Sequence, residues 1–463
     1  MPIGDLAPDI AVLLTAVAAL LAAMALPHRW HAVCAAIALA GLAVAAGFAV
    51  AQSGAARLTF QGTVALDAAT TLARLLILGA TALVIGLCPA WFATDRRHGE
   101  VYAMLLFSAL GAMAVAAAAD LMQLVVGVLL SSVTGYVLAA YHRSWPLSVE
   151  AGMKYFLIGA LANGLMAIGV VLVLGMTGAT AYGGLDGSAP TDPLALAGIL
   201  LVLVGLLFKL GAVPAHSWVP DVAEGAPAPV AAFLTVVPKI AAAVALARVV
   251  GLFPEASALR LLLALTAAAT MTLGNAAALW QDDMRRMLGW SSVAQAGYAL
   301  MAVAVIGTSP HAPAALLAFV GAYALANLAA FAAVAVLRGR TARVGYRGLA
   351  RQRPLAALAL ILALLSLVGI PPLAGFFGKL ALFLAAIDGG LAWLALVGLA
   401  NSVLSLVFCL RFIAPMVFRA SEGHAHALGA RARASMAVAA AALVLVVPFA
   451  GPIWDGLPGA LLP

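Results

Sequence analysis

The sequence predicts an all-α integral membrane protein with about 14 transmembrane helices. Hydrophobic residues make up 65% of the 463 residues, charged residues make up only 9%, and the mean hydropathy is +1.13. A soluble domain carries about 25% charged residues. Apolar stretches separated by charges, glycine and proline recur along the whole chain, and a transmembrane helix needs about 20 mostly apolar residues.

Division of the chain at these interruptions gives fourteen candidate spans and no strand pattern. The first candidate carries Asp5 and Asp9 and no basic residue before its apolar run. Because a secretory signal begins with a positive region, we expect this segment to be retained as a span. Spans four and five are separated only by Asp120. The candidates lie near residues 9–26, 33–52, 69–93, 100–119, 121–141, 150–176, 193–214, 226–250, 256–280, 286–307, 312–337, 355–386, 391–418 and 434–452.

The loop arginines support this count. If the loops alternate sides, fifteen arginines fall on one side and only Arg57, Arg248 and Arg260 fall on the other. Basic residues concentrate in cytoplasmic loops, so both termini are predicted to be periplasmic. The formal net charge of +7 reflects this bias, and no nucleic acid is needed to explain it. The fifteen are Arg29, Arg96, Arg97, Arg143, Arg285, Arg286, Arg338, Arg340, Arg343, Arg347, Arg351, Arg353, Arg419, Arg431 and Arg433.

Spans four to eight and spans nine to thirteen have parallel layouts. In each run the fourth span is interrupted by glycine and proline and carries a lysine, within 208–214 and 369–379. Because five is odd, the second run is inverted, and inverted repeats with broken helices are typical of ion-coupled transporters. We therefore expect a three-helix segment at 1–98, a first inverted repeat at 99–252, a second at 253–418, and a cytoplasmic loop with the last span at 419–463.

The chain has only four lysines against 20 arginines, and all four lysines lie in apolar segments. Arginine stays charged, whereas a buried lysine can lose its proton. Lys209 and Lys379 are flanked by apolar residues beside helix breaks, whereas snorkelling to the interface needs a position near a helix end, so proton transfer is favoured. Lys239 is expected to relay protons between the two halves. The alternative for Lys239 is a structural lysine held by a carbonyl that Pro238 leaves unbonded.

Lys154 and Glu150 are four residues apart. This spacing is that of an ordinary helix-stabilising pair, so a structural role and a role in proton transfer are equally supported. His216 titrates near neutrality, and it either feeds protons to the buried lysines or belongs to a rigid loop at 214–229. We expect Asp221 and Glu224 in this loop to cap the next helix.

The sequence predicts no metal or nucleotide site. Cys34, Cys88 and Cys409 are isolated, without a C-x-x-C pair, so an iron–sulfur or zinc site is not expected. No glycine-rich loop follows a strand, which argues against binding of NADH or ATP by this chain. His424 and His426 form H-x-H, but a metal site needs more ligands. We expect 282–286 to be a solvated loop of paired charges.

Several of these segments together resemble the antiporter-like N subunits of bacterial NADH:quinone oxidoreductase (complex I). The resemblance covers about residues 65–415, and the tract "GAPAPV" at 225–230 is closest to subunit N. It implies two linked half-channels, with Lys209 the buried lysine of the first, Lys239 the bridge and Lys379 the outlet lysine. It also implies partner subunits that hold NADH, FMN, iron–sulfur clusters and quinone, with no redox site in this chain. The matching segments are 102–108, 150–156, 208–210, 218–233, 239–240, 285–298 and 369–379.

Two residues depart from this family pattern. Leu129 stands where the family has a glutamate that pairs with the lysine of span seven, and Gln295 stands where histidine is frequent. Without that glutamate, Lys209 is expected to be mostly neutral when its cavity is dry, unless a neighbouring chain supplies a carboxylate. Glutamine at 295 cannot titrate.

The expected function is proton translocation in the bacterial inner membrane. The chain would act as a multi-pass subunit of a respiratory NADH:quinone oxidoreductase, in contact with lipid, protons and other membrane-arm subunits. Two alternatives remain open. One is a subunit of an Mrp-type cation/proton antiporter or of another complex related to complex I. The other is a structural membrane-arm subunit with impaired pumping.

Overall fold

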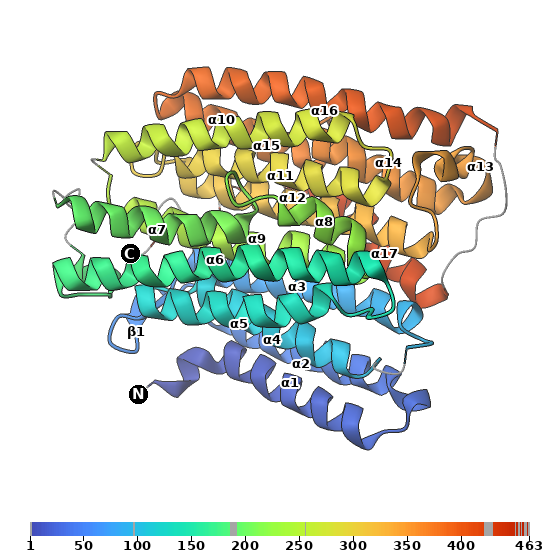
Figure 1. The fold of residues 1–463 in the computed structure, drawn as a ribbon, viewed down its shortest axis with the longest axis horizontal. Helices are drawn as coiled ribbons and strands as arrows, with labels where there is room; N and C mark the ends of the chain where they lie inside the picture. The colour runs from blue at the N-terminus through green and yellow to red at the C-terminus, as the bar shows by residue number, and fades with distance from the viewer. Residues whose placement is uncertain are drawn as a thin grey trace.

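The computed structural model of the chain forms one bundle of nearly parallel helices (Figure 1). Ten of its helices are long and apolar enough to cross a membrane, and two further apolar helices, Glu100–Ala116 and Pro354–Val368, are shorter. These statements concern the residues that the structure describes, and a multi-pass, mostly helical membrane fold is confirmed for them. The described residues are 2–95, 98–185, 192–254, 256–420, 429–449, 451, 454, 456–457 and 461.

The helix order follows the predicted spans within a few residues, with two additions. The segment between spans seven and eight contains a short helix, α8, and the twelfth predicted span consists of two helices, α14 and α15. The helices of the first half are α1 (Ala7–Ala25), α2 (Ala32–Ala51), α3 (Ala68–Trp91), α4 (Glu100–Ala116), α5 (Leu121–Ala139), α6 (Pro146–Thr177), α7 (Pro193–Leu210), α8 (Trp218–Gly225) and α9 (Ala228–Gly251).

Eight further helices follow among the described residues. They are α10 (Ser257–Leu279), α11 (Met284–Val303), α12 (Ala312–Val336), α13 (Leu349–Gln352), α14 (Pro354–Val368), α15 (Ala374–Asp388), α16 (Ala392–Phe418) and α17 (Ala430–Leu445). Single 3-10 turns lie at η1 (Ile3–Leu6), η2 (His28–Trp30), η3 (Tyr182–Gly184), η4 (Arg343–Tyr346) and η5 (Val447–Phe449).

Aspartates at helix starts set several of these boundaries. Asp67, Asp120, Asp192 and Asp283 each accept hydrogen bonds from main-chain N–H groups in the first turn of the helix that follows. Such a cap satisfies donors that have no partner within the helix. The predicted separation at Asp120 is therefore confirmed. The expected solvated loop at 282–286 is wrong for Arg285, which lies within α11 and is 6% exposed.

A short hairpin is the exception to the all-α prediction. Strands β1 (Arg57–Thr59) and β2 (Val64–Leu66) pair antiparallel between α2 and α3. The turn uses positive φ angles at Phe60 and Gln61 (52° and 59°) and at Gly62 (86°). Strands of three residues are too short to produce a detectable alternating pattern, which is why the sequence did not reveal them.

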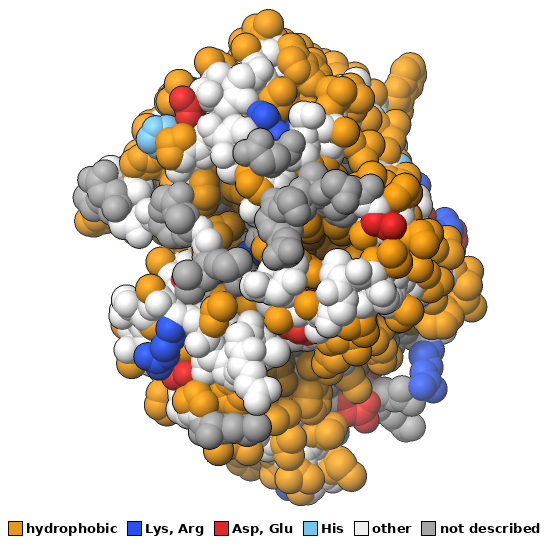
Figure 2. Space-filling view, turned by 90° about the vertical axis from the view of Figure 1, so that its left-hand side faces the viewer, with side chains coloured by type: hydrophobic (Ala, Val, Ile, Leu, Met, Phe, Trp, Pro, Cys, Tyr) orange, Lys and Arg blue, Asp and Glu red, His pale blue; other side chains and the backbone are white. Residues whose placement is uncertain are grey.

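The centre of the bundle is formed by α9 and α12. The most apolar stretch of α9 is entirely buried, whereas only 22% of that of α1 is buried. Figure 2 looks onto one end of the bundle, where hydrophobic side chains gather around much of the outline and charged side chains are few. An apolar periphery is what a helix bundle in contact with lipid requires.

One buried ion pair connects α3 with α1, and a second connects the start of α3 with α9. Arg74 on α3 pairs with Asp9 on α1 at 2.5 Å, and Arg248 on α9 pairs with Asp67 at 2.7 Å. Arg248 is 1% exposed, so its expected position in a loop is wrong. The Asp67 carboxylate draws Arg248 into the bundle, because a buried charge requires a counter-charge.

Adjacent helices approach closely where glycines face each other. A Cβ atom at Gly169 on α6 would lie 2.5 Å from the Gly198 carbonyl oxygen on α7, whereas a Cβ atom at Gly164 on α6 would meet nothing within 4 Å. Small residues of this kind allow transmembrane helices to pack backbone against backbone.

We therefore expect Gly169→Leu to lower the free energy of unfolding by about 1–3 kcal/mol, because the new side chain forces α6 and α7 apart. Gly164→Leu adds the same side chain to the same helix and should change stability by less than about 0.5 kcal/mol. Thermal unfolding of the purified chain in detergent compares the two. Equal losses in both variants would contradict the close packing of α6 on α7.

Candidate functional site

Three lysines lie inside the bundle on three different helices. Lys209 on α7 is 2% exposed, Lys239 on α9 is 2% exposed and Lys379 on α15 is 3% exposed. Each amine donates to uncharged oxygen atoms, and none forms an ion pair among the described residues. The site therefore consists of buried amines in polar but uncharged surroundings.

Lys209 faces the polar side of α5. Its Nζ lies 3.3 Å from Ser131 Oγ. The next residue, Ser132, accepts a hydrogen bond from Asn163 Nδ2 on α6 at 3.2 Å, and the same amide donates to Tyr136 OH at 3.2 Å. A cluster of hydroxyl and amide groups thus takes the place of a carboxylate beside Lys209.

Leu129 lies on the opposite side of α5. Residues two positions apart in an α-helix are separated by about 200° around its axis. Residues 129 and 131 therefore point in nearly opposite directions. Leu129 is 42% exposed, whereas Ser131 is 2% exposed. A glutamate at 129 would therefore lie on the outer face of the chain, and the expectation that it would pair with Lys209 within this chain has no support in the geometry. The outer stripe consists of Met122, Val126, Leu129, Val133 and Val137.

Lys239 lies against the end of α7. Its Nζ donates to the Ser292 carbonyl oxygen on α11 at 2.6 Å. A Cβ atom at Gly211, the residue that ends α7, would lie 3.2 Å from the same Nζ. The alternative in which Pro238 supplies the acceptor is therefore wrong, because the carbonyl belongs to a neighbouring helix.

Hydroxyl groups continue from Lys239 toward α12. Ser292 Oγ and Tyr323 OH lie 2.7 Å apart, and the Tyr323 hydroxyl lies 2.6 Å from the Thr235 carbonyl oxygen. Asn327 Nδ2 donates to Thr235 Oγ1 at 2.8 Å. Tyr323 is 5% exposed, and the other three residues are each at most 1% exposed.

Helix α11 connects the surroundings of Lys239 with those of Lys379. Gln295 follows Ser292 by one helical turn and donates to the Leu367 carbonyl oxygen at 2.9 Å, at the end of α14. The adjacent Val368 carbonyl oxygen accepts from Lys379 Nζ at 3.0 Å. One further turn along α11, the ring of Tyr298 lies 4.2 Å from that Nζ. Gln295 thus occupies the position between the two lysines.

The lysines adjoin two helix breaks of the same construction. Gly211 ends α7 with φ 72° and Gly369 ends α14 with φ 93°, and each is followed by a cis proline bond. In each break the glycine N–H and the next N–H return to carbonyls of the last turn, which closes the helix end. A Cβ atom at Gly369 would lie 3.0 Å from Lys379 Cδ, so each glycine supplies both the positive φ and room for a lysine.

Lys154 belongs to a charged network at the edge of the site. Its Nζ lies 2.6 Å from Glu150 and 3.0 Å from Asp221, and Arg286 Nη1 lies 2.6 Å from Asp221 and 2.7 Å from Glu224. The predicted Glu150–Lys154 pair is thus present. The expectation that Asp221 and Glu224 cap the next helix is wrong, because they belong to α8 and their carboxylates bind neighbouring helices.

Sequence reasoning also missed the position of Arg285. Arg285 is 6% exposed, and its guanidinium donates to the carbonyl oxygens of Ala223 and Ala226 at the end of α8. A cation at a helix C-terminus interacts favourably with the helix dipole. No local signal in the sequence distinguishes this buried arginine from its neighbour Arg286, because its hydrogen-bond acceptors are carbonyl groups at the end of α8.

His216 lies between α7 and α8 and contacts neither Lys209 nor Lys239 by a hydrogen bond among the described residues. Its Nδ1 and Trp290 Nε1 are both buried without a protein partner, and the two rings lie 5.8 Å apart. The roles considered for His216 stay predictions. His424 and His426 lie outside the described residues.

Comparisons with known proteins agree on one family. Residues 118–405 match the family model described as the transmembrane region of NADH:quinone oxidoreductase/Mrp antiporter. A Mycobacterium protein named NADH-quinone oxidoreductase subunit N is 45% identical over 397 residues, which cover 85% of this chain and 84% of that protein. A Streptomyces griseus protein named NADH-quinone oxidoreductase subunit N 1 is 46% identical over 431 residues, covering 91% and 90%.

Solved structures show the same fold. A chain of respiratory complex I from Thermus thermophilus superposes with a TM-score of 0.85 at 32% identity, covering 98% of this chain and 100% of that chain. A chain of the Mrp complex from Dietzia sp. superposes with a TM-score of 0.86 at 21% identity, covering 98% and 96%. The second likeness concerns the fold alone.

We expect the charged network around Arg286 to stabilise α8. Arg286→Ala removes the cation shared by Asp221 and Glu224, so the amides of α8 should exchange hydrogen about tenfold faster. Arg343→Ala is the matched control, since Arg343 pairs only with the exposed Asp282 among the carboxylates of the described residues, at 3.1 Å. Hydrogen-exchange mass spectrometry of residues 218–225 measures the effect. Unchanged exchange in Arg286→Ala would show that packing alone holds α8.

Proposed function

The chain belongs to the NADH:quinone oxidoreductase/Mrp antiporter transmembrane family, and we propose that it translocates protons as an N-type membrane subunit of a bacterial NADH:quinone oxidoreductase. The observation that carries this proposal is the set of three buried lysines without a carboxylate partner among the described residues. A buried amine that lacks a counter-charge can exist with or without its proton. That property is what a proton carrier inside a membrane requires.

The route runs through Lys209, Lys239 and Lys379 in that order. Lys209 accepts the proton in the first half, and Lys239 relays it from a position against the α7 break. Lys379 releases it from the second half, where it adjoins the α14 break. Between Lys239 and Lys379 the proton is transferred through water molecules, because the Gln295 side chain does not titrate.

We propose an architecture of fourteen spans with two inverted five-helix repeats, in the ranges 99–252 and 253–418. The matching breaks at Gly211 and Gly369 support it, as does the arrangement of the broken helices in Figure 1, where α7 leads into α8 in one direction and α14 leads into α15 in the other. The arginine-rich loops then face the cytoplasm, and both termini are periplasmic.

Redox chemistry belongs to partner subunits in this proposal. NADH, FMN, iron–sulfur clusters and quinone bind elsewhere in the complex, and this chain, which holds no redox centre, responds through charge and conformation. Membrane-arm subunits contact its outer faces. The exposed apolar stripe of α5 that includes Leu129 is one surface that lipid or such a neighbour would cover.

Replacement of the buried lysines tests the function. Lys209→Met, Lys239→Met and Lys379→Met each keep an apolar side chain of similar length, and each should lower proton translocation about tenfold or more, since the carrier group is gone. Lys154→Met is the control, because Lys154 is 43% exposed and lies in an ion-pair network; it should change translocation less than about twofold. Protons moved per electron are measured in proteoliposomes that contain the assembled complex.

An unchanged proton-to-electron ratio in assembled Lys209, Lys239 and Lys379 variants would instead indicate a structural subunit. The same measurement with and without sodium separates the remaining alternative. Translocation that requires sodium would favour an antiporter of the Mrp type.

A carboxylate placed beside Lys209 should trap its proton. Ser131→Asp puts a carboxylate where the hydroxyl lies 3.3 Å from Nζ, so translocation should fall about tenfold, because the charged amine gains a buried partner. Ser131→Asn has the same shape without the charge. Leu129→Glu carries the charge on the outer face of α5. Both controls should retain activity, and a loss in Leu129→Glu as large as in Ser131→Asp would show that residue 129 reaches Lys209.

A further inference from the structure

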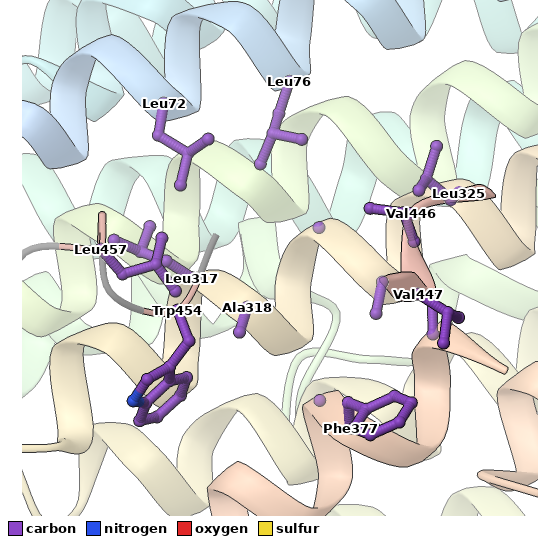
Figure 3. Close-up of a pocket in the computed structure, with 14 residues that line it drawn as sticks. Leu72, Leu76, Leu317, Ala318, Leu325, Phe377, Val446, Val447, Trp454 and Leu457 are labelled. Carbon is purple, nitrogen blue, oxygen red and sulfur yellow. The ribbon is translucent and has the colours of Figure 1, made fainter. Parts of the chain in front are cut away.

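An apolar pocket opens between α3, α12, α15 and the segment after α17. Its volume is about 290 Å³, and nearly all of its surface is hydrocarbon. Figure 3 shows Leu72 and Leu76 reaching into it from α3, with Phe377 and the indole of Trp454 on the opposite side. The described residues that line the pocket include no charged side chain.

The pocket lies just beyond the end of α17. Helix α17 packs on α12, α3 and α14. It has 16 residues and α12 has 25, which correspond to lengths of about 24 Å and 37 Å. The hydrocarbon core of a bilayer is about 30 Å thick. Among the described residues beyond Leu445, Val446, Val447, Trp454 and Leu457 line the pocket.

We propose that a phospholipid acyl chain occupies this pocket, next to the end of α17. Water is a poor occupant, because the lining offers almost no hydrogen-bonding groups. An empty pocket would forfeit the dispersion contacts of its walls. A lipid chain can enter sideways from the bilayer and needs no polar partner, so hydrocarbon is the occupant that the chemistry of the walls selects.

The acyl chain lies next to the second helix break. Phe377 and Gly378 form the wall of the pocket, and Lys379 follows them on α15. An acyl chain on the outer side of this wall would keep water from reaching the Lys379 amine through the pocket. This consequence rests on the proposed function, whereas occupancy of the pocket does not.

The chain offers a variant that fills the pocket and a matched control. Gly321 lines the pocket, and a Cβ atom there would meet only Leu76 methyl carbons, at 3.7 and 3.8 Å, so Gly321→Leu has room to extend into the space. A Cβ atom at Gly79 on α3 would meet nothing within 4 Å. Gly79→Leu therefore adds the same side chain to the exposed surface.

The test uses phosphatidylcholine with a photoreactive diazirine in its acyl chain. Membranes that contain the assembled complex are loaded with this lipid and irradiated, and the adducts are mapped by peptide mass spectrometry. Wild type and Gly79→Leu should carry adducts on Leu317 and Leu325, and Gly321→Leu should carry at least about fivefold fewer. Adducts on Leu14, which is 63% exposed, serve as the internal standard and should not change.

Equal labelling of Leu317 and Leu325 in wild type and Gly321→Leu would overturn the proposal. So would their absence from wild type while Leu14 is labelled, a result that decides the question even if Gly321→Leu does not assemble. Labelling requires no turnover, so failure of this proposal can be distinguished from failure of proton translocation.

Discussion

Inside a bilayer every main-chain N–H and C=O group needs a partner within the protein, and the two helix breaks are where this requirement is hardest to meet. The last carbonyls of α7 and α14 are satisfied partly by the glycine turns themselves. Side chains also donate to carbonyls at these two helix ends. Trp218 Nε1 donates to the Phe208 carbonyl oxygen at 3.1 Å, and Lys379 Nζ donates to the Val368 carbonyl oxygen at 3.0 Å. The tertiary arrangement around the site depends on these caps.

A lysine suits such a cap because it remains a donor in both protonation states. The ammonium group offers three hydrogens, and the neutral amine still offers two. Lys379 can therefore release a proton without leaving the Val368 carbonyl unsatisfied, and the helix end need not rearrange at each cycle. An arginine would stay charged and could not perform this exchange. The structural role and the proposed carrier role thus favour the same residue.

The sequence predicted the multi-pass, mostly helical membrane fold and the burial of three lysines, because these features have local signals. Apolar length, glycine with proline, and a lysine in an apolar run can each be recognised without knowledge of the neighbours. Residues whose environment is set by another helix could not be predicted. The pairing of Arg286 with Asp221, the burial of Arg285 and the outward position of Leu129 all depend on how α8, α11 and α5 pack.

The position of Gln295 has a consequence for how the two halves communicate. Its amide is fixed by the Leu367 carbonyl oxygen, one residue from the acceptor of Lys379, so it joins the lysines geometrically but exchanges no proton itself. In the proposed route, transfer between Lys239 and Lys379 waits for water to enter between α11 and the α14 break. Hydration thus becomes the step that opens or closes the connection, and a conformational change in a partner subunit could control the path by admitting that water. A dry hydrocarbon wall on the far side of Lys379 would confine this water to the interior.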